Sequence, residues 1–203
     1  MNDELARIKL DDKKYVVLSH TDSVYSLEGL TNEDTDNFKL VEGISDLNSY
    51  IEDNWENYNL TGQDIFDRNS NITDLTSDLK RVANRNNTSV LPVYIYRHSG
   101  VVYSPYPIAY GNQFDGGLIP SAFLMMNKDY IKKLSCKKIV LNKYVLFYGK
   151  GFLENMTAVC NGEVYDILLV DDEDSIIDSC CGFLNFDNKP YEDFLKELSD
   201  WFI

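Results

Sequence analysis

The chain has 203 residues, and its 44% of apolar residues is typical of a globular protein and excludes an intrinsically disordered one. Its 33 acidic and 19 basic residues give a formal net charge of −14. This charge argues against a general nucleic-acid-binding protein, which needs a cationic face for the phosphates. No apolar run approaches the roughly 18 residues of a membrane span, and the N-terminus lacks the apolar stretch of a secretory signal. We therefore expect a soluble, cytoplasmic protein.

The first 56 residues predict a β-hairpin followed by a helix. Residues 14–18 are rich in strand formers, and residues 24–27 are the expected partner strand. A helical spacing of apolar residues then begins at Ser45, which we expect to be the N-cap. A segment of about 56 residues makes only a marginal domain alone. We therefore expect residues 1–56 to complete the same domain as residues 57–203.

A second helix and a strong strand follow in the middle of the chain. Thr73 is the expected cap of this helix, and the two asparagines at 86–87 would end it. Residues 90–96 are almost continuously apolar, which predicts a central strand. Gly100 marks a tight turn with a positive φ, and residues 101–103 are the expected partner strand.

Beyond this hairpin the chain again alternates between strand and helix. Residues 118–126 predict a strand, and Asn127 is the expected cap of a helix that follows it. Residues 138–159 mix β-branched and aromatic residues with two glycines. Their pattern fits both helix and strand, so they stay unassigned.

The C-terminal part predicts a second hairpin and a last helix. Residues 163–170 and 175–180 read as antiparallel strands joined by the acidic turn at residues 171–174, and Pro190 opens a helix with an apolar stripe. The order of elements predicts an α+β protein. We expect a mostly antiparallel sheet with helices packed on one face, in a single compact domain.

Charge is distributed unevenly along the chain. Residues 125–150 carry a local net charge of +6, whereas residues 161–203 carry −10 and residues 1–124 carry −9. These charges can pair with one another or stay solvated, which is the ordinary role of exposed charge. Alternatively, the carboxylates form an acidic face that resembles a polyanion, with the lysines on another side.

The sequence gives no pattern for a metal or a cofactor. The four cysteines lack a CxxC spacing, and only two histidines could help them to bind zinc. The acidic run at residues 171–174 lacks the alternating ligands of an EF-hand loop. The glycines fit neither the P-loop nor the dinucleotide fingerprint. We expect neither a metal nor a cofactor.

Three short motifs stand out: YRHSG at residues 96–100, FDGG at 114–117 and DSCCGF at 178–183. The motif residues of interest are His98, Ser99, Gly100, Phe114, Asp115, Gly116, Gly117, Asp178, Ser179, Cys180, Gly182 and Phe183. Together they resemble a family of small proteins encoded by bacteriophages, plasmids and integrated mobile elements. That family shows a strand ending in HSG, a loop with WDSG and a later DSCWGF.

The resemblance covers roughly residues 57–187 and includes three departures. Phe114 and Cys181 stand where the family has Trp, and Gly116 stands where it has Ser. Membership would make this chain a divergent member. The family has no established activity, and its carriage on mobile elements implies a role against host defence or in host takeover.

We first expect a non-enzymatic protein that binds a host protein. The resemblance and the acidic excess together indicate an inhibitor of the anti-CRISPR or antirestriction type, directed at a nuclease or another nucleic-acid-handling defence complex. Its carboxylates would lie where phosphates bind, with no direct contact to nucleic acid. The candidate partner-binding residues are Asp171, Asp172, Glu173 and Asp174.

One alternative is a structural or regulatory phage component that acts through a self-associating surface. The other is a small cysteine-dependent hydrolase. His98 would act as general base for Cys180, with Ser99 and Cys181 as other candidate nucleophiles. Asp115 or Asp178 would orient the imidazole. The same residues also have a structural interpretation, in which His98 and Ser99 hold the loop at 104–117.

Overall fold

The computed structural model describes residues 4–21, 37–55, 72–109, 116–135, 141–184 and 189–199, except for the side chains of 72–74 and 141. These residues form eight strands and five helices, and all strand pairs are antiparallel, which confirms the α+β class. The strands form two four-stranded sheets, where we expected one. The chain divides into two compact units: unit 1 is Met1–Leu30 with Ala158–Ile203, and unit 2 is Thr31–Thr157.

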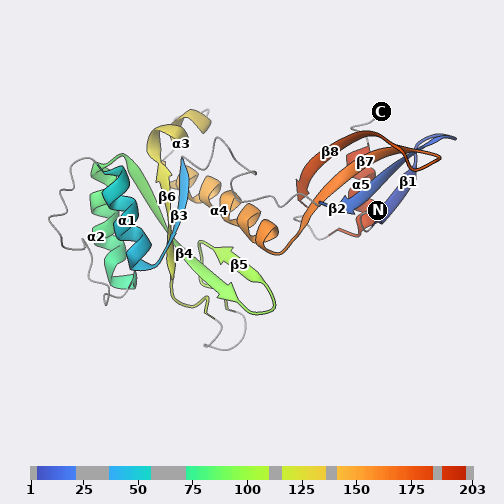
Figure 1. Ribbon diagram of the computed structural model, residues 1–203. Coiled ribbons are helices and arrows are strands. Elements are labelled where there is room, and N and C mark those ends of the chain that lie inside the picture. The colour runs from blue at the N-terminus through green and yellow to red at the C-terminus, as the bar shows by residue number, and fades with distance from the viewer. Residues whose placement is uncertain are drawn as a thin grey trace. The chain divides into compact units, whose positions relative to one another are not determined.

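Unit 1 contains a sheet built from both ends of the chain (Figure 1). Its order is β1 (Glu4–Lys9), β2 (Lys14–His20), β7 (Val164–Asp171) and β8 (Ile176–Leu184). The strand expected at 14–18 therefore pairs with β1 and β7. The partner that we expected for it, residues 24–27, lies outside the described residues. The expected domain boundary between residues 56 and 57 lies outside them too.

One helix covers one face of the unit 1 sheet. Helix α5 (Tyr191–Ser199) follows Pro190, as expected, and buries Phe194 and Leu195 against the sheet. The strands contribute alternate residues to this core, because successive side chains of a strand point to opposite faces. The buried strand residues are Ala6, Val16, Leu18, Tyr165 and Ile167.

The sheet of unit 2 has the order β3 (Phe38–Glu42), β6 (Ala122–Asn127), β4 (Thr88–Arg97) and β5 (Val101–Ser104). Strand β4 contains the apolar run at 90–96 and lies inside the sheet, as predicted. The five apolar residues at 122–126 are all buried. A strand that is apolar at every position must be covered on both faces.

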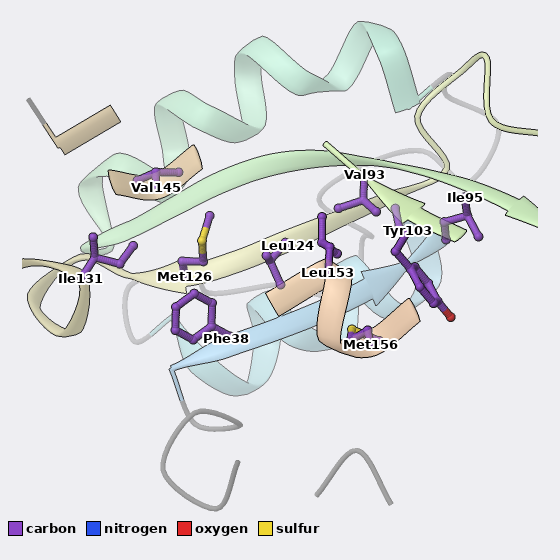
Figure 2. Close-up of a cluster of buried hydrophobic side chains, with 11 residues drawn as sticks. Phe38, Val93, Ile95, Tyr103, Leu124, Met126, Ile131, Val145, Leu153 and Met156 are labelled. Atoms are coloured by element: carbon purple, nitrogen blue, oxygen red, sulfur yellow. The ribbon is translucent and has the colours of Figure 1, made fainter. Parts of the chain in front are cut away.

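Helices cover both faces of this sheet, and this differs from the single covered face that we expected. Helices α1 (Gly43–Asn54) and α2 (Ile72–Arg85) pack on the face that carries Phe123 and Met125. Helices α3 (Lys128–Leu134) and α4 (Leu141–Cys160) pack on the face of Leu124 and Met126. Figure 2 shows Phe38, Leu124, Met126 and Leu153 in this second core. Burial of each such side chain contributes about 1.5–3 kcal/mol.

Local signals in the sequence mark where α3 and α5 begin, but not where α1 does. The Asn127 side chain accepts hydrogen bonds from the backbone N–H groups of Asp129 and Tyr130, which confirms the expected cap of α3. The expected cap at Ser45 is wrong, since α1 begins at Gly43. Gly43 has a φ of 83°, so the chain turns from β3 directly into the helix. Among the described residues, no helix is long and apolar enough to cross a membrane.

Candidate functional site

The HSG motif forms the turn between β4 and β5. The backbone N–H of His98 donates to the carbonyl of Gly100 over 3.1 Å, and all three residues of the motif are exposed. The residue with positive φ is Ser99, at 51°, and the expectation that Gly100 would supply it is wrong. The left-handed conformation falls at the middle residue of this three-residue turn, where the chain reverses.

The glycines of the FDGG motif lie against the end of β4. Gly116 forms an isolated bridge with Tyr96 and has a φ of 82°. The backbone N–H of Ile108 donates to the carbonyl of Gly117 over 2.7 Å. The first two motifs therefore meet in space and tie residues 108 and 116–117 to the β4–β5 hairpin. The other two motif residues, Phe114 and Asp115, lie outside the described residues.

The DSCCGF motif lies on β8, an edge strand of the unit 1 sheet. Cys180 is opposite Ile167 and Cys181 is opposite Asp166, so the two thiols point to opposite faces. Both cysteines are exposed. The next residue, Gly182, has a φ of 88° where the register of the β7–β8 pair shifts. Such a bulge is a common device at a sheet edge.

Two further residues of this motif, Asp178 and Phe183, have structural contacts. The carboxylate of Asp178 accepts a hydrogen bond from the backbone N–H of Ser179 over 2.8 Å. Phe183 packs at the margin of the unit 1 core. The motif therefore combines an edge strand, a bulge and a packed aromatic side chain. Each of these three features contributes to the fold of unit 1.

The hydrolase hypothesis places its residues in two different units. His98 and Ser99 belong to unit 2, whereas Asp178 and Cys180 belong to unit 1. No unit taken by itself contains the general base together with the cysteine nucleophile. Among the described residues, no group of three His, Cys, Asp or Glu side chains is placed to hold a metal ion.

The acidic run Asp171–Asp174 forms the turn between β7 and β8, as expected. One carboxylate oxygen of Asp171 accepts from the backbone N–H groups of Glu173, at 3.0 Å, and Ser175, at 2.8 Å. This Asx-type bonding shapes the turn. Two of the four acids, Asp172 and Glu173, are exposed and take part in no ion pair with the described residues.

The fourth acid of the turn, Asp174, binds Arg7 of β1. The guanidinium of Arg7 lies 2.8 Å from the carboxylates of both Glu4 and Asp174. Hydrogen bonds to Glu4 first, and to Asp174 second, raise the pKa of Arg7. Sequence reasoning missed this contact, because 167 residues separate the two partners. The structure therefore divides the acidic run into two residues that build the turn and two that face solvent.

The unit 1 sheet brings a second acidic turn to the same end. Lys14 at the start of β2 is opposite Asp171 at the end of β7. The β1–β2 turn, which contains Asp11 and Asp12, therefore lies at the end of the sheet that carries the β7–β8 turn. One of these acids, Asp12, forms an exposed ion pair with Lys9 at 3.1 Å.

Most of the net charge of the protein resides in unit 1. Its 76 residues include 18 acids and six basic residues, a net charge of −12. Unit 2 has 15 acids and 13 basic residues, a net charge of −2. The chain thus joins a strongly acidic unit to one that is almost neutral.

Comparison with protein-family models, curated proteins and solved structures finds no match for this chain. The resemblance of the three motifs to a mobile-element family therefore stays a prediction.

Proposed function

We propose that this protein is a phage or mobile-element accessory protein that inhibits a host defence complex, and that unit 1 binds the partner through its carboxylates. The observation that carries this proposal is the concentration of charge: a net −12 in unit 1 against −2 in unit 2. A field of one sign over a small unit attracts a cationic surface and speeds association.

The two acidic turns supply the contact residues for this proposal. Asp172 and Glu173 are exposed at the tip of the β7–β8 turn, without ion-pair partners among the described residues. A partner could therefore bind them without first breaking an internal ion pair. Asp171 and Asp174 hold the turn in shape through its backbone and through Arg7.

The chemistry of the partner follows from this surface. A cationic channel that normally holds phosphates fits a compact unit that presents carboxylates, which supports a nuclease or other nucleic-acid-handling complex as target. The motif resemblance supports the same class. Binding through exposed charges is screened by salt, so the affinity should fall steeply with ionic strength.

The test is an affinity pull-down of the tagged full chain from host-cell lysate, followed by kinetics with the captured partner at low and high salt. The variant Asp172→Lys with Glu173→Lys should slow association about tenfold at low salt, since rim charges act mainly on the on-rate. It should also flatten the salt dependence of binding.

A matched control makes the same change of charge in the other unit. Glu52→Lys with Asp53→Lys alters two exposed acids of α1, in unit 2. This control should leave the association rate within about twofold of the unaltered chain, because the proposal assigns the contact to unit 1 and both altered acids belong to unit 2. Equal loss in both double variants would show that only the total charge matters and would refute the assigned surface.

A further inference from the structure

A cavity of about 600 Å³ lies in unit 2, where α2, the start of β4, α3 and the first turns of α4 meet. Val145 of α4, labelled in Figure 2, belongs to its wall. Cavities of about 300–1,000 Å³ are the usual size for small-molecule sites. This one is therefore large enough for a ligand the size of a nucleotide.

The topology of the sheet explains why the cavity is there. Strand β5 pairs with β4 only from Tyr94 to Arg97. The preceding stretch, Thr88–Val93, pairs with β6 on one side, and no described strand pairs with it on the other. Pro92, which has no N–H to donate, lies in this open stretch. The helices on the two faces of the sheet flank this open edge and form the walls of a hollow that is open to solvent on one side.

The lining of the cavity is cationic, although the protein as a whole is acidic. Lys80 and Arg81 of α2 and Lys128 of α3 line it. Among the described residues that line it there is no Asp or Glu. The nearest acid on the same helix face, Asp78, is paired with Arg81 at 3.2 Å and lies outside the lining.

Lys128 is a buried cation without a negatively charged partner in the lining. It is only 9% exposed. Its ammonium group donates to the side-chain oxygen of Asn84 and, over 3.3 Å, to the backbone carbonyl of Asn84. Both acceptors are neutral. Burial, and then the nearby charge of Lys132, lower the pKa of Lys128.

A buried charge normally has an opposite charge beside it. Without one, its removal from water costs on the order of several kcal/mol. Lys128 meets instead two amide oxygens and a cavity whose other charges are also positive. An anion in the cavity would supply the missing charge. The guanidinium of Arg81 and the ammonium groups of Lys80 and Lys128 offer it charge-assisted hydrogen bonds.

The remaining wall suits an organic body attached to that anion. The apolar side is formed by Val90, Leu91, Val145 and Leu146. The polar side includes Ser89 and Asn142, and also Thr88, whose hydroxyl donates to the backbone carbonyl of Asn86. The wall thus combines polar and apolar surface, with the polar share larger, as suits a charged ligand that also has a small apolar part.

We infer that this cavity binds the phosphate group of a phosphorylated small molecule of nucleotide size. The phosphate lies against Lys128 and Arg81, and the organic body lies against Val145 and Leu146. This site is separate from the acidic turns of unit 1 and does not depend on the function proposed for them.

The experiment is calorimetric titration of the full chain at low salt with four probes: AMP, ribose 5-phosphate, inorganic phosphate and adenosine. AMP is expected to bind more tightly than inorganic phosphate or adenosine, because only AMP offers both the anion and the apolar body. Ribose 5-phosphate should fall between AMP and inorganic phosphate. No detectable binding of any phosphate, or equal affinity for AMP and inorganic phosphate, would overturn the inference.

Two variants and two controls locate the site. Lys128→Met and Arg81→Gln should each weaken AMP binding about tenfold, equivalent to about 1.4 kcal/mol. The controls Lys133→Met, on the same helix as Lys128, and Arg85→Gln, on the same helix as Arg81, alter cations outside the lining and should change the affinity less than twofold.

Comparing these variants with their controls distinguishes binding in the cavity from binding to a diffuse basic surface. Equal weakening by Lys128→Met and Lys133→Met would assign the binding to the general charge of the lysine-rich segment and refute the cavity. Unchanged AMP affinity in both Lys128→Met and Arg81→Gln would do the same. Circular dichroism of each variant checks that it folds. If Lys128→Met fails to fold, Arg81→Gln still tests the site, because Arg81 is exposed.

Discussion

Tyr96 and Gly116 form an isolated antiparallel bridge that joins the end of β4 to the glycines of the second motif. A Cβ atom on Gly116 would lie 2.7 Å from the backbone carbonyl oxygen of Ile95. The φ of Gly116, at 82°, is also one that residues with a side chain rarely adopt. The two motifs therefore meet in a geometry that requires glycine.

The first prediction concerns Gly116→Ala. This substitution should lower the free energy of unfolding of the chain by about 2–4 kcal/mol, since it combines a left-handed backbone with a contact that backbone atoms must relieve. Urea unfolding followed by circular dichroism measures the change.

The control for this prediction is Gly43→Ala in the same unit. Gly43 has a similar φ of 83°, but a Cβ there meets nothing within 4 Å. Gly43→Ala should lower the free energy of unfolding by about 1–2 kcal/mol, which is the cost of the left-handed backbone alone. Equal losses for the two variants would show that the close approach to Ile95 adds nothing.

The second prediction compares two glycines in α4. Gly151→Ala should raise the free energy of unfolding by about 0.5–1 kcal/mol, because alanine is the better helix former and its Cβ meets nothing within 4 Å. Gly149→Ala should lower it by about 1–2 kcal/mol, since overpacking outweighs propensity. Its Cβ would lie 2.7 Å from Leu91 and 3.3 Å from the sulfur of Met126.

The two helix variants are read from the same urea titrations. A stabilised Gly149→Ala protein would mean that Leu91 moves into the cavity that it lines at no cost. A destabilised Gly151→Ala protein would contradict the open surroundings of that position. Opposite signs two residues apart are the diagnostic result.

Elements with strong local signals were predictable from the sequence. Asn127 caps α3 and Pro190 precedes α5, because a cap acts on neighbouring residues. The apolar run of β4 predicted a central strand, because a continuous apolar run is also a local signal. Helix α4 escaped prediction because its apolar residues surround much of the helix: Val145 and Leu153 enter the core while Phe147 stays 70% exposed.

The assembly of these elements was not predictable, and the candidate site shows why. Strand β2 pairs with β7, although most of the chain lies between them in the sequence. No local pattern encodes a pairing of such distant segments. That pairing splits the strands into two sheets, and it also places His98 and Cys180 in different units. Motif chemistry identifies residue types, whereas the topology decides which of them share a unit.

A third prediction concerns the pH dependence of stability around Asp129. Its carboxylate accepts from Lys132 over 2.8 Å and from the side-chain amide of Asn87 over 2.7 Å. These bonds, led by Lys132, lower the pKa of Asp129 below its ordinary value of 3.8. The folded state therefore gains stability above that value and loses it as the pH falls through the folded-state pKa.

The variant Asp129→Asn tests this sign. Its melting temperature should lie below that of the unaltered chain at neutral pH, and the difference should shrink and vanish in acid. The same substitution in a Lys132→Met, Asn87→Ala background should have no such pH-dependent effect. A difference that grows in acid would contradict the assigned hydrogen bonds.

The last prediction uses the thiols to decide between binding and catalysis. Cys160 and Cys180 are both exposed, at the end of α4 and on β8. A catalytic cysteine is activated as a thiolate, which reacts far faster than an ordinary exposed thiol. If unit 1 is a binding surface, Cys180 should react with iodoacetamide at a rate similar to that of Cys160. Mass spectrometry of the native Cys181→Ser protein resolves the two sites, and a rate at Cys180 more than about tenfold higher would favour the hydrolase.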